Sequence, residues 1–99
     1  MTRIKELVDR MNDEINDAKT YAEDYLTCKA KGNANWANRY KEMANDELKH
    51  SVYIHERIVE EIEELRKVYT PPEEMMEKWE SDHRKFLEKN AWIKQMLAM

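Results

Sequence analysis

The sequence predicts an all-α protein, with a long antiparallel helical hairpin followed by a third, C-terminal helix. Three observations predict this class. The 99 residues include only one Gly and two adjacent Pro, and 38% of them are charged. Apolar residues recur at steps of three and four, which is the helical period. β-branched residues are scarce, and no stretch alternates apolar and polar residues as a half-buried strand does. A chain of this length forms one domain, residues 1–99.

The first helix is expected over residues 2–31. Gly32 follows its last turn at the position where helices often end in a left-handed residue, and Asn33 can cap the next helix. Such a tight turn makes the first two helices antiparallel neighbours. The expected apolar stripe of the first helix is Ile4, Leu7, Val8, Met11, Ile15, Ala18, Tyr21, Ala22, Tyr25 and Cys28.

The second and third helices are expected over residues 34–69 and 71–98. Thr70 and Glu73 have the spacing of a capping box, and Pro71 suits the first position of a helix. The second stripe also extends beyond what the first helix can cover, which predicts a homodimer or larger oligomer. The two stripes are Trp36, Tyr40, Met43, Glu47, His50, Ile54, Ile58, Ile62 and Leu65, then Met76, Trp79, His83, Phe86, Asn90, Ile93 and Leu97.

Charge and cysteine content exclude several classes of protein. The net charge of −4 argues against a nucleic-acid partner, which needs a basic face. Cys28 is the only cysteine, so an intrachain disulfide and a Cys-based zinc or iron–sulfur site are excluded. No apolar run has the length of a membrane span or the pattern of a signal peptide. We therefore expect a cytoplasmic protein without a membrane partner.

Glu47 and His50 form a Glu-x-x-His pair on the expected stripe of the second helix. Residues three apart on a helix project side by side and can share a metal ion. Glu14 lies on the first stripe, so all three side chains are expected to face inward. Gly32 lies midway between Glu14 and His50 in the sequence. Antiparallel helices joined at Gly32 therefore bring Glu14 level with the Glu47–His50 turn. The sequence predicts a metal site made by Glu14, Glu47 and His50.

These three residues amount to half of a carboxylate-bridged dinuclear centre. In a four-helix bundle such a centre takes one Glu from each of two helices and Glu-x-x-His from each of the other two. Two copies of the hairpin, related by a two-fold axis, would supply the full set. Oxygen-rich ligands with imidazole suit iron, and manganese or zinc can occupy the same geometry.

The segment from Glu14 to Tyr21, followed by Glu47-Leu-Lys-His50, resembles the first half of a rubrerythrin or ferritin-like di-iron domain over about residues 3–65. The half-length arrangement is similar to encapsulated ferritin, whose site is completed across a subunit interface. The resemblance implies a ferritin-like four-helix bundle completed by dimerisation. It also implies ferroxidase or peroxide-linked iron chemistry, with no catalytic residues beyond the metal ligands.

Two alternatives stay open. Glu80 and His83 form a second Glu-x-x-His pair, but a third helix folded back at the prolines places them near residues 57–61, roughly 10 Å from the first pair along the axis. His83 is then a core-edge histidine or an interface group. The rival function is a metal-free helical adaptor that oligomerises through the same stripe, with its polar residues hydrogen-bonded across the interface.

Overall fold

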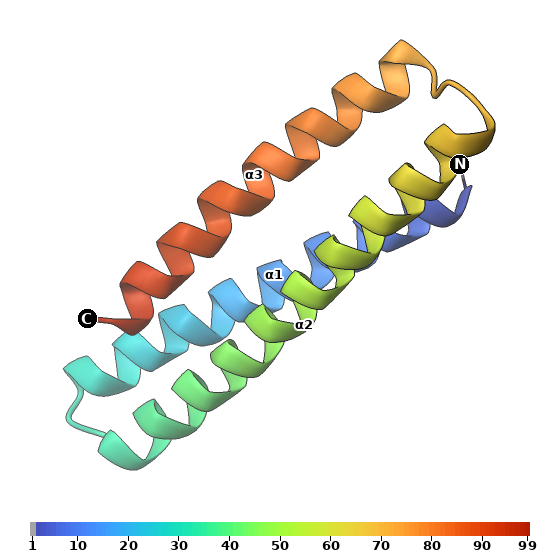
Figure 1. The fold of residues 1–99 in the computed structure, drawn as a ribbon. Coiled ribbons are helices and arrows are strands. Elements are labelled where there is room, and N and C mark those ends of the chain that lie inside the picture. Colours follow the sequence, from blue (N-terminus) through green and yellow to red (C-terminus); the bar gives the residue numbers. More distant parts are fainter. Residues whose placement is uncertain (1) are drawn as a thin grey trace.

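The computed structural model describes residues 2–99 and confirms the all-α class. It consists of three helices, α1 (Thr2–Ala30), α2 (Ala34–Val68) and α3 (Glu73–Leu97). α1 and α2 form an antiparallel hairpin, and α3 returns along its length, so that the C-terminus lies near the α1–α2 turn (Figure 1). The molecule is a rod with extents of 55 × 17 × 17 Å.

The turn between α1 and α2 forms as the sequence predicts. Gly32 has a φ of 75°, the left-handed conformation that glycine adopts without steric cost. The side chain of Asn33 caps α2 by accepting a hydrogen bond from the backbone N–H of Trp36 at 3.2 Å. This turn fixes the register of α1 against α2, and with it the height at which residues of the two helices meet.

The predicted capping box before α3 does not form. α3 begins at Glu73, Pro72 precedes it, and no side chain caps its first turn. Each proline keeps the residue before it out of the helical region, so Thr70 and Pro71 stay extended or turned. Glu73 is consequently the first residue of the helix and not the third, which is the position a capping box requires.

The core confirms the α1 stripe and the C-terminal half of the α2 stripe, from Ile54 to Leu65, but corrects the N-terminal half of the α2 stripe. All buried residues of α1 belong to the predicted stripe: Ile4, Leu7, Val8, Met11, Ile15, Ala18, Ala22 and Tyr25. The buried residues of α2 are Ala37, Ala44, Leu48, Ser51, Ile58 and Ile62. The seam therefore contains small residues of both helices, which allow the backbones to approach closely. Of the predicted α2 residues, Trp36, Met43 and His50 are exposed, and Tyr40 and Glu47 lie at the edge of the seam.

α3 packs mainly against α1, and its predicted stripe is largely confirmed. Trp79, Phe86, Ile93 and Leu97 are buried, while Met76, His83 and Asn90 are half-buried. The sequence interpretation missed Asp82, which is buried and pairs with Lys78 at 3.2 Å. The Nζ of Lys89 donates a hydrogen bond to the Asn16 side chain at 3.0 Å, which joins α3 to α1.

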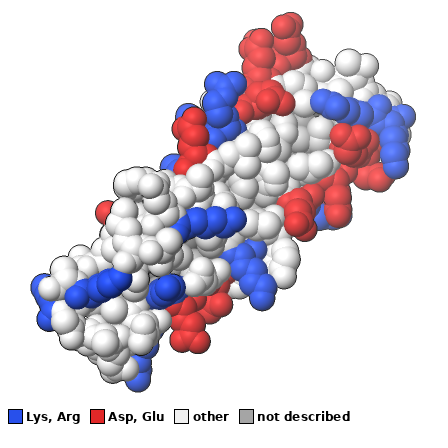
Figure 2. Space-filling view, turned by 60° about the vertical axis from the view of Figure 1, so that its left-hand side comes forward, with Lys and Arg blue, Asp and Glu red and all other residues white. Residues whose placement is uncertain are grey.

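The surface carries charges of both signs. Figure 2 shows a face on which acidic and basic side chains are interspersed, with an uncharged band between them in its upper half. Among the described residues, no helix combines the length and the apolar character that a membrane span requires.

Candidate metal site

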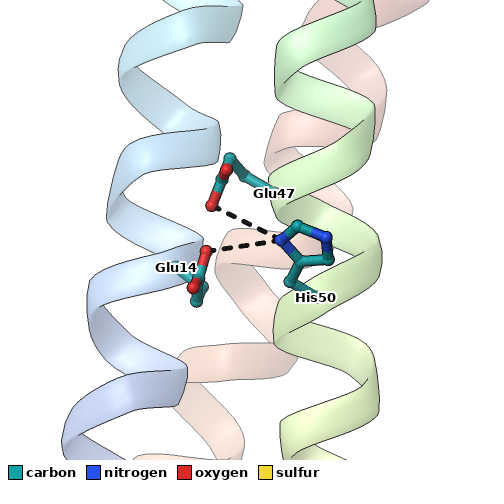
Figure 3. A group of neighbouring side chains, drawn as sticks. All are labelled: Glu14, Glu47 and His50. Carbon is teal, nitrogen blue, oxygen red and sulfur yellow. Dashed lines mark ion pairs between the residues drawn. The ribbon is translucent and has the colours of Figure 1, made fainter.

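Glu14, Glu47 and His50 come together as the sequence predicts. The Nδ1 of His50 lies 3.8 Å from Glu14 Oε2 and 3.9 Å from Glu47 Oε2 (Figure 3). One ligand atom from each of the three residues lies within 4.8 Å of the others. The register set at Gly32 therefore brings an α1 carboxylate level with the Glu-x-x-His turn of α2.

The three side chains lie on the side of the hairpin that α3 does not cover. In Figure 3 the α3 ribbon passes behind α1 and α2, while the three side chains stand in front of these helices. Glu47 and His50 are one turn apart on α2 and project the same way. The site is thus an outer feature of the hairpin, at the edge of the α1–α2 seam.

The site is more exposed than the sequence interpretation held. The side chains of Glu14 and Glu47 are 32% and 25% exposed, so both are half-buried, whereas His50 is 53% exposed. We expected all three to face inward. The small residues of the seam, such as Ala44 and Ser51, occupy the inward positions instead, and this displaces the larger neighbours toward the flank.

The two carboxyl groups impose an electrostatic cost on each other. A hydrogen bond from the Glu47 carboxyl to Glu14, together with burial and the negative charge of Glu14, raises the pKa of Glu47 to about 7, although His50 opposes the rise. Asp17 adds a smaller contribution in the same direction. Two like charges held this close favour a shared proton or a shared cation.

An unsatisfied oxygen marks the centre of the site. With Glu47 ionised, Glu14 Oε2 is buried and has no hydrogen-bond partner; the proton of a neutral Glu47 can supply one. Buried polar atoms in folded proteins normally have such a partner, because leaving one without costs free energy. A cation among the three side chains would satisfy this oxygen and neutralise both carboxylates. Two oxygen donors and one imidazole nitrogen form a suitable ligand set for iron, manganese or zinc.

Asp17 is the one contributor that the sequence interpretation missed. It lies three residues after Glu14, so it projects from the same face of α1 one turn further on. This three-residue spacing from Glu14 was the signal that could have identified Asp17 from the sequence. Its negative charge adds to the rise in the pKa of Glu47.

Glu80 and His83 do not join this site. His83 instead faces His55 of α2, with His83 Nδ1 and His55 Nε2 2.8 Å apart. This agrees with the expectation that His83 is a core-edge residue at a different height from Glu14. Within residues 2–99, only Glu14, Glu47 and His50 form a group of three or more potential ligands with their atoms this close.

Comparison of the chain with protein-family models, curated proteins and solved structures gives no match.

Proposed function

We propose that this protein binds a dinuclear metal centre, best suited to iron, between the hairpins of two copies. The observation that carries the proposal is the convergence of Glu14, Glu47 and His50 around a buried carboxylate oxygen without a hydrogen-bond partner. Without a cation, two ionised carboxylates held together at this position repel each other. A bound cation compensates both charges.

The number of ligands supports a second copy. One chain supplies two carboxylates and one imidazole, which is too few for two metal ions with four or more ligands each. Two chains supply four carboxylates and two imidazoles, the set of a ferritin-like centre. The exposure of His50 is consistent with a site that a second hairpin covers.

The surface beside the site supports the same pairing. Trp36 and Met43 are exposed on α2 at helical spacing from Glu47, and Tyr40 lies between them. The ring of Tyr40 contacts those of Tyr21 and Trp36, with centroids 6.3 Å and 5.8 Å away. Exposed aromatic and Met side chains are typical of interfaces. The rival adaptor function would use this surface without a metal.

The proposed reaction is oxidation of Fe(II), with iron as the substrate. Two Fe(II) ions give one electron each to dioxygen, which takes up two protons and leaves as hydrogen peroxide. With peroxide as the oxidant, two protons are again consumed and two water molecules form. Glu14 and Glu47 would bind and orient the ions as terminal and bridging carboxylates, and His50 would supply the nitrogen ligand. Glu47, whose pKa is raised to about 7, would release its proton as a cation binds.

Metal content per chain tests the proposal. The purified protein, loaded anaerobically with Fe(II) and desalted, should retain about one iron per chain, and Glu47→Ala and His50→Ala should lose it. Glu63→Ala is the matched control, because Glu63 is exposed on the same helix and pairs with Arg66. Oxygen consumption on adding Fe(II) should be high in the parent and in Glu63→Ala, and it should be lost in Glu47→Ala and His50→Ala. Equal iron retention in all four proteins, with the oligomeric state changed by His50→Ala, would favour the adaptor function.

A further inference from the structure

A second pair of imidazoles, His55 of α2 and His83 of α3, joins these two helices. His55 Nε2 and His83 Nδ1 share a hydrogen bond of 2.8 Å, and the two rings are stacked with centroids 4.9 Å apart. Phe86 and Trp79 flank His55 at centroid distances of 4.7 Å and 5.6 Å. The aromatic neighbours restrict both imidazoles. Two nitrogen atoms from different helices are therefore held face to face.

Each imidazole offers a lone pair when its ring is neutral. Burial, followed by the charge of His83, lowers the pKa of His55, so His55 is neutral at pH 7. In a hydrogen bond between neutral imidazoles, one facing nitrogen donates its N–H and the other accepts. If the donor ring moves its proton to its outer nitrogen, both facing nitrogens become acceptors. Neutral imidazole nitrogens are the form that binds metal ions.

We propose that His55 and His83 bind a divalent cation of the zinc or copper class, which replaces the shared proton and links α2 to α3. In a tetrahedral site, metal–nitrogen bonds of about 2.0–2.1 Å place two ligand nitrogens about 3.3 Å apart. The observed separation of 2.8 Å must then widen by about 0.5 Å. Small rotations of the two side chains supply that change.

The ligand set distinguishes this site from the one at Glu14. Across residues 2–99, no third His, Cys, Asp or Glu brings a ligand atom to this pair, so water would complete the coordination. Both rings are half-buried, which leaves solvent access. Nitrogen ligands without a carboxylate favour zinc and copper over iron and manganese. The inference does not depend on the proposed iron chemistry.

The test uses the full chain carrying Glu47→Ala and His50→Ala, which removes the first site. Zinc chloride is titrated into this protein by calorimetry, and the thermal unfolding midpoint is measured with and without zinc. We expect about one zinc per chain and a higher midpoint in its presence, because a ligand that binds the folded state stabilises it.

Two further substitutions locate the bound zinc. His83→Asn and His55→Gln place amide nitrogens near the positions of Nδ1 and Nε2, so each can keep a hydrogen bond while removing one imidazole ligand. Each should weaken zinc binding at least tenfold and abolish the zinc-dependent rise in the midpoint, with the circular dichroism spectrum unchanged. The proposal fails if the starting protein binds no zinc below millimolar concentration, or if both variants bind zinc as it does. A variant that unfolds is replaced by His83→Gln or His55→Asn at the same position.

Discussion

Two histidine clusters of this molecule differ in how their polar groups are satisfied. His50 lies on the uncovered face of the hairpin beside two carboxylates, one of which has a buried oxygen without a hydrogen-bond partner. His55 lies under α3 among aromatic rings, and its nitrogen is hydrogen-bonded to His83. The first cluster contains a buried oxygen without a hydrogen-bond partner, whereas the facing nitrogens of the second are hydrogen-bonded to each other. A titratable cluster whose groups lack partners is thus the stronger pointer to a ligand.

The second cluster should contribute far more to stability than the surface beside the first. Phe86 is buried and stacks on His55, so Phe86→Ala should lower the free energy of unfolding by about 3–5 kcal/mol. Trp36→Ala, at a side chain that is 44% exposed, should cost about 1 kcal/mol or less in the isolated chain. Denaturant unfolding of a dilute, metal-free sample measures both. Equal losses of unfolding free energy in the two variants would mean that the surface beside Glu14, which includes Trp36, is buried in an interface even in the dilute, metal-free sample.

Glu47→Gln should have opposite effects with and without metal. The pKa of Glu47 is raised to about 7 from 4.5, so the folded state binds this proton more tightly than the unfolded state does. The stabilisation is fully present below pH 4.5 and is lost as the pH rises through 7. At pH 8 the metal-free variant should therefore be more stable than the parent, and this advantage should shrink toward pH 5.

Iron should reverse that order at pH 8. A cation stabilises the parent through both carboxylates, whereas the variant has lost one of them. Unfolding midpoints of both proteins, with and without Fe(II) under anaerobic conditions, give the comparison. Glu63→Gln on the same helix is the control, since its carboxylate is exposed. A parent that gains no stability from iron would contradict the proposed site.

His55 should make the protein less stable in acid. Its folded-state pKa lies below the ordinary value of 6.5, because burial and the charge of His83 disfavour the charged ring. The contribution to stability is present above pH 6.5 and is lost as the pH falls through the lowered pKa. The difference in stability between the parent and His55→Gln should therefore change in the variant's favour from pH 7 to pH 5. Glu47 makes both proteins more stable as the pH falls. Its contribution cancels when the stability of His55→Gln is subtracted from that of the parent, and the remaining pH dependence is that of His55. A constant difference would show that the His55–His83 pair does not resist protonation.

The sequence predicted the level along the helix axes at which Glu14, Glu47 and His50 meet, but not how deeply these side chains are buried. Register follows from counting residues on either side of Gly32, and the count brought Glu14 to His50 correctly. Depth depends on which α2 residues enter the seam. We assigned these positions to the larger apolar residues, such as Trp36 and Met43, whereas close helix packing selected Ala44 and Ser51. Hydrophobicity alone does not show where two helices approach most closely.

The contact between His55 and His83 was harder to predict, because the sequence does not fix the length of the loop that joins their helices. The position of the prolines correctly placed His83 away from Glu14. It did not show that His83 would meet His55, since this requires the rotation of α3 as well as its register. Asp82 was missed for the same reason, because one step around α3 decides whether residue 82 or residue 83 faces the core.

The smallest expected effect comes from the ion pair at the edge of α3. Lys78 and Asp82 are four residues apart with a nitrogen–oxygen distance of 3.2 Å, and the Lys78 side chain is 70% exposed. Lys78→Ala should cost about 0.3–0.5 kcal/mol, as exposed helical pairs of this spacing do. Added salt should reduce this cost further, because the pair is screened. Unfolding in low and high salt measures both values. A loss well above 1 kcal/mol would show that Asp82 depends on Lys78 for its burial. Part of the polar network under α3 would then need a counter-charge.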